Sequence, residues 1–300
     1  MIRHFGQKTF LEKRVKLMNS HMQDLAFTSA GDFMDAPNRF IAAMDHSGGS
    51  TGGVLERYGQ EYTEENKMDL VHEMRLRMYN SPHFNSSSIW AAILYKDTLE
   101  RGMVPLLKKK GIEAFLKIDS GCAEDGMLHD FDIVEMLDLA LYNDCIGTKM
   151  RSIVKTDTIM KPIVRQQITL ANIIIERGLL PIVEPEVPID HPDKNEIENA
   201  LLDYLKEKLD DLKGQCILKL TIPTMQNLYY ELTYHPNVYK VVGLSGGYST
   251  EEACSKLSLN TNMTASFSRA LSEKLYAGQT DSQFNAQMKD NIRMIKDACQ

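Results

Sequence analysis

The sequence contains no apolar run that approaches the ~20 residues needed for a membrane-spanning helix. It also lacks an excess of positive charge, because 34 Lys and Arg are outnumbered by 41 Asp and Glu and the formal net charge is -7. Proteins that bind nucleic acid generally need a basic face, so this balance argues against such a partner. We expect neither a membrane nor a nucleic-acid partner, and any anionic ligand must be held by a local cluster of cations.

Paired cysteine and histidine motifs are also missing. The five cysteines are odd in number and form no Cys-x-x-Cys pair. Free thiols of this kind are typical of a reducing compartment, so we expect a cytoplasmic protein. The eight histidines show no His-x-His or His-Glu-x-x-His spacing, and we predict no metal and no cofactor. The basic first 17 residues have no continuous apolar core, which argues against a secretory signal.

No Pro- or Ser-rich linker divides the chain. We expect an N-terminal extension over residues 1–35 and one domain over residues 36–300. Within that domain, short apolar segments alternate with charge-rich ones, and continuous apolar runs suit strands buried on both faces of a parallel sheet. The expected strands are 39–45, 89–95, 112–119, 145–152, 179–187, 216–222, 238–245 and 263–270.

The segments between these strands have helical patterns. In 194–212, leucines that include Leu201 and Leu205 recur at helical spacing. Ser249 and Glu252 form a capping box, which predicts a helix start just after a Gly-Gly pair. Eight strands separated by helices predict the α/β class and a single (β/α)8 TIM barrel with parallel strands. An open doubly wound sheet is the structural alternative.

Lys219 lies in the middle of an apolar segment, 216–222, that should be buried. Burying an ammonium costs several kcal/mol unless it is paired or loses its proton. Other charged residues gather toward the carboxyl ends of the expected strands, where barrels bind ligands. They are Asp45, Lys117, Asp119, Lys149, Arg151, Glu184, Glu186 and Arg269.

Any one of these residues is more often a salt-bridge partner or a helix cap than a catalyst. Three lysines on one rim are a different matter, because they repel one another and are desolvated. At least one of them should therefore have a lowered pKa. A neutral amine in a pocket is a nucleophile whose natural target is a carbonyl.

The glycine turn "SGGYS" (245–249) predicts an anion site. It leads into a helix N-terminus, where free N–H groups and the helix dipole favour negative charge. Arg269 on the next expected strand can add a bidentate contact to phosphate. A second anion could bind near Ser47 and Lys117, across the pocket.

Several motifs occur in a fixed order, namely "RFIAAMDHSGGST", "FLKIDSG", "GTKMRS", "GLLPIVEPEV", "LKLTIP", "LSGGYS" and "ASFSRAL". This combination resembles the class I (Schiff-base) fructose-1,6-bisphosphate aldolases, most closely the short bacterial type. The resemblance implies metal-independent, reversible cleavage of fructose 1,6-bisphosphate to dihydroxyacetone phosphate and glyceraldehyde 3-phosphate in glycolysis and gluconeogenesis. Barrels of this kind usually assemble, so a homo-oligomer is expected, either a dimer or a tetramer.

The resemblance also implies catalytic roles. Lys219 would attack the C2 ketone of the open-chain sugar, and the iminium would stabilise the carbanion formed when the C3–C4 bond breaks. Glu184 would be the general acid and base, and Lys149 would stabilise the developing oxyanion. Glu186 would orient the lysines, and Asp45 would hold substrate hydroxyls near the cleaved bond.

Phosphate-binding residues carry over in the same way. The C1 phosphate would be bound by Ser245, Gly246, Ser266 and Arg269. The C6 phosphate would be bound by Ser47, Lys117 and Arg151. The sequence departs from the family where Gly52-Gly53 replaces a basic residue of the first helix. It also ends without the C-terminal tyrosine that vertebrate enzymes use in proton exchange, a role that a glutamate or Tyr276 would have to fill.

Three alternatives remain at this point. Another Schiff-base lyase, such as a transaldolase-like enzyme, would be separated by its activity on monophosphates. A metal-dependent class II aldolase would lose activity to a chelator, although histidines are missing from the strand ends. A scaffold or adhesin on the same fold would keep its binding activity after Lys219→Ala.

Overall fold

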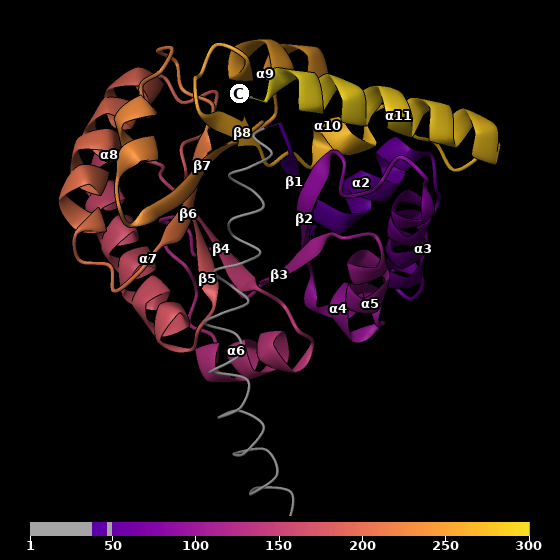
Figure 1. The fold of residues 1–300 in the computed structure, drawn as a ribbon, viewed down its shortest axis with the longest axis horizontal. Coiled ribbons are helices and arrows are strands. Elements are labelled where there is room, and N and C mark those ends of the chain that lie inside the picture. Colours follow the sequence, from indigo (N-terminus) through magenta and orange to yellow (C-terminus); the bar gives the residue numbers. More distant parts are fainter. Residues whose placement is uncertain (1–37, 47–49, 300) are drawn as a thin grey trace, which may run out of the picture.

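The computed structural model describes residues 38–46 and 50–299, so Ser47 and the extension predicted for residues 1–35 lie outside the described part. Within it, eight parallel strands form one sheet in chain order (Figure 1). The strands are β1 (Phe40–Met44), β2 (Ile89–Leu94), β3 (Glu113–Lys117), β4 (Gly147–Ile153), β5 (Leu180–Glu186), β6 (Cys216–Thr221), β7 (Val238–Leu244) and β8 (Met263–Ala265).

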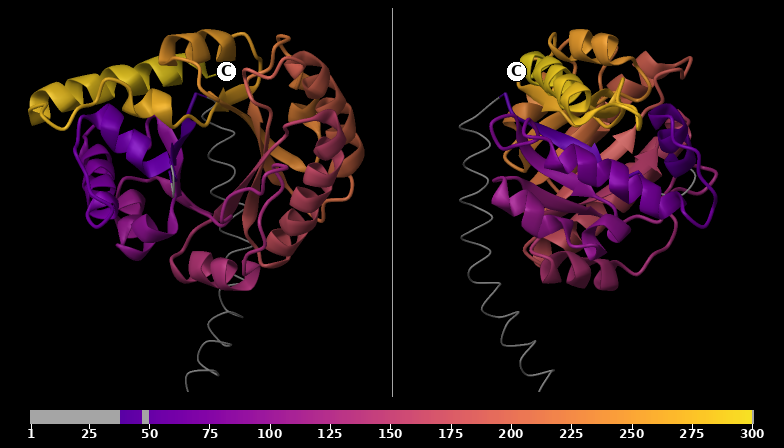
Figure 2. Two further views of the ribbon diagram at one scale, coloured as in Figure 1. Left: turned by 180° about the vertical axis from the view of Figure 1, so that it is seen from behind. Right: turned by 90° about the vertical axis from the view of Figure 1, so that its right-hand side faces the viewer.

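Helices alternate with these strands and surround them (Figures 1 and 2). The helices are α2 (Ser50–Tyr58), α3 (Lys67–Asn80), α4 (Lys96–Glu100), α5 (Met103–Lys109), α6 (Ile133–Tyr142), α7 (Asp157–Glu176), α8 (Lys194–Leu209), α9 (Thr250–Leu257), α10 (Arg269–Ser272) and α11 (Asp281–Ala298). A 3-10 helix, η1 (Tyr230–Tyr234), lies between β6 and β7. In the described ranges, no helix is both long and apolar enough to span a membrane.

The first and last strands meet and nearly close the barrel. The Ala43 amide donates to the Phe267 carbonyl at 3.1 Å, and the Thr264 hydroxyl donates to the Arg39 carbonyl at 2.7 Å. All seven strand pairs are parallel. The predicted (β/α)8 barrel is confirmed, and the open doubly wound sheet is not what the chain forms.

Apolar side chains fill the barrel interior below the carboxyl ends of the strands, on the amino-terminal side of the charged residues. Phe115, Ile182 and Ile217 belong to a separate cluster of buried residues inside the ring of strands. Gly147 makes room for this layer, because a Cβ there would overlap the Leu180 carbonyl oxygen and come within 2.5 Å of the Phe115 ring. The interior is therefore a packed floor and not an open channel.

Charged side chains occupy the interior one step further along the same strands. Because side chains two residues apart share a face of a strand, Lys117 follows Phe115, Glu184 follows Ile182, and Lys219 follows Ile217. The charged groups thus lie directly on a layer of apolar side chains, which cannot solvate them.

The eighth strand is shorter than predicted. The segment 263–270 was expected to be extended, but β8 ends at Ala265 and α10 begins at Arg269. The Ser266 amide still donates to the Gly243 carbonyl at 2.8 Å, after which the chain turns away from the ladder. Arg269 is therefore on a short helix at the rim of the barrel and not on a strand.

Candidate active site

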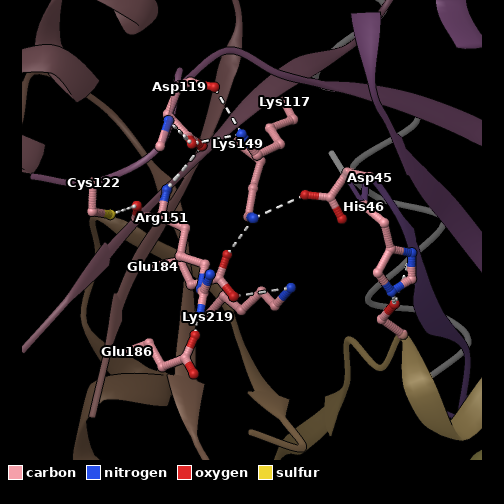
Figure 3. Close-up of polar contacts among 12 residues, drawn as sticks. Asp45, His46, Lys117, Asp119, Cys122, Lys149, Arg151, Glu184, Glu186 and Lys219 are labelled. Atoms are coloured by element: carbon pink, nitrogen blue, oxygen red, sulfur yellow. Dashed lines mark hydrogen bonds and ion pairs between the residues drawn. The ribbon is translucent and has the colours of Figure 1, made fainter. Parts of the chain in front are cut away.

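Four buried charged side chains form the centre of the site (Figure 3). Lys149 Nζ lies 2.9 Å from Asp45 Oδ2 and 2.8 Å from Glu184 Oε2. Lys219 Nζ lies 3.1 Å from the other oxygen of the same glutamate, Glu184 Oε1. The residue after β1 and the strands β4, β5 and β6 thus bring two ammoniums and two carboxylates together in one alternating chain of charge.

This pairing changes the expectation for the lysines. Burial alone would lower the pKa of Lys149, but the charges of Asp45 and Glu184 outweigh it and raise that pKa above its ordinary value. Burial would likewise raise the pKa of Asp45, yet Lys149 and Lys219 together hold it well below its usual range. The sequence showed the lysines and their mutual repulsion but not the two carboxylates that lie between them, so Lys149 is not a lysine with a lowered pKa.

A glutamine on α7 fixes the backbone of Glu184. Gln167 is fully buried; its Nε2 donates to the Glu184 carbonyl at 3.1 Å, and its Oε1 accepts from the Glu184 amide at 2.9 Å. The pairing of β5 with β6 covers Ile182 and Val183 and stops before Glu184. The side-chain amide therefore replaces a strand partner at this position and holds the Glu184 backbone in place.

Glu186 has a different partner from the one predicted. Its Oε2 lies 2.5 Å from Arg151 Nε, and burial of Arg151 is outweighed by Glu186, so the pKa of Arg151 is raised. Glu184, and not Glu186, contacts both lysines. Glu186 is on the same face of β5 but two residues further along, opposite Ile153, and so lies beyond the level of the lysines.

Lys117 also has a carboxylate partner. Its Nζ lies 2.6 Å from Asp119 Oδ1 and donates to the Asp119 carbonyl at 2.7 Å. Asp119 further accepts from the amides of Gly121 and Arg151. Of the residues predicted to bind a C6 phosphate, Lys117 and Arg151 therefore lie on the cavity wall with their charges already balanced, and Ser47 lies outside the described residues.

The opposite wall offers donors without carboxylate partners. Ser245, Gly246, Ser266 and Arg269, all predicted phosphate ligands, line the same cavity. The Ser266 hydroxyl is buried and has no hydrogen-bond partner among the described residues. A buried polar atom normally finds a partner, so an unsatisfied one on a cavity wall indicates a place for a ligand.

The N-terminus of α9 is less available than the sequence indicated. Ser249 caps the helix as predicted, accepting from the Glu252 amide. The Thr250 amide donates to Glu273 at 3.0 Å, so a carboxylate of the chain already lies at this helix end. The first turn of α9 is therefore already occupied by a carboxylate, which leaves the Gly246–Gly247 turn as the candidate anion site on this wall.

His46 lies on the cavity wall beside Asp45 and was not among the predicted site residues. Its Nε2 lies 2.6 Å from the Ser268 hydroxyl, and its carbonyl accepts from the fully buried Arg75 of α3 at 2.5 Å. The pKa of His46 is lowered to about 4, chiefly by burial; Asp45 opposes this shift, and the charges of Arg75 and Arg57 add to it. The imidazole is therefore neutral near pH 7.

The free energy of unfolding should decrease as the pH is lowered, because of His46. Its native pKa of about 4 is below the unfolded value of about 6.5, so between these values only the unfolded chain binds the proton. The free energy of unfolding should therefore be fully retained above pH 6.5 and fall by up to about 1.4 kcal/mol per pH unit down to pH 4. Urea unfolding at pH 7.5, 6.5, 5.5 and 4.5 should show a shallower decline for His46→Gln. Parallel curves for the two proteins would contradict this assignment.

One cavity of about 530 Å³ collects these groups. Its walls combine the lysine and glutamate centre, the Lys117–Arg151 wall and the Ser245–Gly247 wall, and its volume is in the range of small-molecule sites, roughly 300–1,000 Å³. Within residues 38–46 and 50–299, no group of three or more His, Cys, Asp or Glu side chains could hold a metal ion. The arrangement suits amine and carboxylate chemistry on an anionic ligand.

Comparison with known proteins supports the fold. No family model matches the sequence. The structure is similar to that of fructose-bisphosphate aldolase from Plasmodium falciparum, solved in complex with TRAP and a small-molecule inhibitor, with a TM-score of 0.70 and 21% sequence identity. The match covers 93% of this chain and 94% of the other. The two chains share one fold.

The sequence pointed to the four central residues but not to the residues that support them. Asp45, Lys149, Glu184 and Lys219 were each predicted, and the structure brings them into contact. Three further residues were not predicted: Gln167 holds the backbone of Glu184, and His46 and Arg57 line the cavity. A polar residue on the apolar face of the helix 157–176 was a signal for the first of these, since it must find a buried partner.

Proposed function

We propose that this protein is a class I aldolase that reversibly cleaves fructose 1,6-bisphosphate to dihydroxyacetone phosphate and glyceraldehyde 3-phosphate through an imine on Lys219. The observation that carries the proposal is the buried Lys219 amine, 3.1 Å from a glutamate that also contacts a second lysine. A buried amine beside a carboxylate can pass its proton to that carboxylate and then attack a carbonyl. Similarity of fold to an aldolase supports the same reaction class.

The residues would act in the following order. Glu184 accepts a proton from Lys219, whose amine adds to the C2 ketone, and then returns a proton as water leaves to form the iminium. When the C3–C4 bond breaks, the iminium takes up the electron pair as an enamine, and the C4 hydroxyl gives its proton to Glu184. Lys149, kept protonated by Asp45 and Glu184, stabilises the oxygen that gains charge.

The two cavity walls would hold the two ends of the substrate. The C1 phosphate suits the wall of Ser245, Gly246, Ser266 and Arg269, because Ser266 is unsatisfied and Arg269 forms no ion pair within the described residues. The C6 phosphate would bind at Lys117 and Arg151, which are already paired with Asp119 and Glu186. We therefore expect the C1 phosphate to contribute more to binding. We also propose a homo-oligomer in the cytoplasm, the latter in keeping with five free cysteines.

The test is imine trapping. The protein is incubated with dihydroxyacetone phosphate, reduced with borohydride, digested and mapped by mass spectrometry, with glycerol 3-phosphate as a control that has no carbonyl. An adduct on Lys219 is expected. An adduct on Lys149 or Lys117 would keep the reaction class and reverse the roles, whereas no adduct on a folded protein would refute the imine mechanism.

A further inference from the structure

The first turn of helix α2 contains two glycines, Gly52 and Gly53, and their neighbours explain why glycine stands there. Glycine inside a helix costs about 1 kcal/mol relative to alanine. A Cβ on Gly52 would overlap the Tyr62 hydroxyl, and a Cβ on Gly53 would lie 3.4 Å from Nη1 of Arg57. Gly53 and Arg57 are four residues apart and so share one face of the helix, along which the arginine side chain runs back toward the helix N-terminus.

This direction brings Arg57 to the cavity, which Arg269 also lines. Nη1 of Arg269 lies 3.9 Å from where a Cβ on Gly247 would be, so both guanidiniums point along the wall of this one cavity. Burial lowers the pKa of Arg57, and the charge of Arg269 also lowers it. In the ranges that the structure describes, neither forms an ion pair with a carboxylate. Two cations held close together in this way are stabilised when an anion lies between them.

The groups next to Arg269 are also suited to an anion. Its Nη1 contacts the Gly247 carbonyl at 3.4 Å, at a turn in which Gly246 and Gly247 have φ values of 57° and 129°. Such turns expose backbone N–H groups in a small concavity that binds anions. Ser266, 2% exposed and without a hydrogen-bond partner among the described residues, lies on the same wall.

We propose that Arg57 and Arg269 form a two-guanidinium clamp that closes on one phosphate monoester group held at the Gly246–Gly247 turn. Each planar guanidinium presents a fork of N–H donors that matches two phosphate oxygens. Arg57 is then a phosphate-binding residue supplied by a helix far from the turn in the sequence. The proposal rests on the proposed function only in taking this phosphate to be part of the substrate.

The clamp is tested first by binding of inorganic phosphate to the full chain, measured by calorimetry. Arg57→Gln should weaken binding about 10- to 100-fold, the effect of losing a charge-assisted hydrogen bond pair. Arg57→Lys should recover part of the loss, since it keeps the charge but not the fork. The control is Arg293→Gln, an equal charge change on the exposed face of α11, which should leave the affinity unchanged.

Two further measurements separate the possible outcomes. In a double-mutant cycle, Arg57→Gln and Arg269→Gln should be non-additive if both hold the same phosphate. In borohydride trapping, Arg57→Gln should raise the concentration needed for dihydroxyacetone phosphate and not that for dihydroxyacetone. Additive losses, unchanged phosphate affinity, or equal effects on both ketones would overturn the clamp. If the wild type traps neither ketone, the proposed function fails while phosphate binding still decides the clamp.

Discussion

Replacing Lys219 with methionine is expected to lower kcat for fructose 1,6-bisphosphate cleavage by about 10⁵-fold or more, the scale seen when an enzyme loses its nucleophile. The fold should survive, because methionine has a similar length and would stand on the apolar layer that contains Ile217. Glu184 also keeps its contact with Lys149 at 2.8 Å. Activity is measured by coupled assay, and folding by urea denaturation.

A second buried lysine provides the control for this variant. Lys194 lies outside the cavity, is as deeply buried, and contacts Glu198 at 2.5 Å. Lys194→Met should lower the free energy of unfolding, because it leaves Glu198 buried without its cation. It should still give the borohydride adduct. A Lys219→Met protein that is trapped as efficiently as the wild type would exclude Lys219 as the nucleophile.

Replacing Glu184 with glutamine is expected to lower kcat by about 10²–10⁴-fold, the usual range for loss of a general acid and base. The variant should also lose about 3–5 kcal/mol of stability, because it removes one partner of a buried charge pair. Glutamine keeps the shape of the side chain but leaves Lys149 and Lys219 with Asp45 as their nearest counter-charge. Imine formation should become slow without being abolished, since Lys219 remains.

Glu186→Gln is the matched control for Glu184→Gln. It makes the same chemical change on the same strand, but at a residue that contacts Arg151. We expect its kcat to fall by less than about tenfold, because no group transferring a proton is removed. If Glu186→Gln has the larger effect on kcat, the two glutamates have exchanged roles and the contacts described for Glu184 are not those of the reacting enzyme.

Much of the fold could be predicted from hydrophobic patterning. The eight apolar segments correspond to the eight strands, because a strand buried on both faces must be apolar along its whole length. The error at β8 has the same origin, since alternating small and apolar residues in "TASFSRA" continue the strand pattern after the ladder has ended. Phe267 is buried in the core, although it lies beyond the last residue of β8.

The sequence contained least information about which charged side chains of the candidate site contact one another. A sequence places Lys149, Glu184 and Glu186 at strand ends but does not state the level at which each lies on the barrel wall. The register of β4 against β5 decides this, since it sets Arg151 opposite Glu184 and Ile153 opposite Glu186. The sign of the Lys149 pKa shift could not be predicted for the same reason, because it depends on two carboxylates, Asp45 after β1 and Glu184 on β5.

The sequence by itself determined the parallel barrel and the candidate residues of its rim, because both follow from local patterns of apolar, charged and glycine residues. Only the tertiary structure decided which charges neutralise one another and which remain free for a ligand. Gln167 reaches Glu184 from α7, and Arg57 reaches the cavity from α2. Coulomb energies depend on separation and burial, and both are properties of the folded barrel.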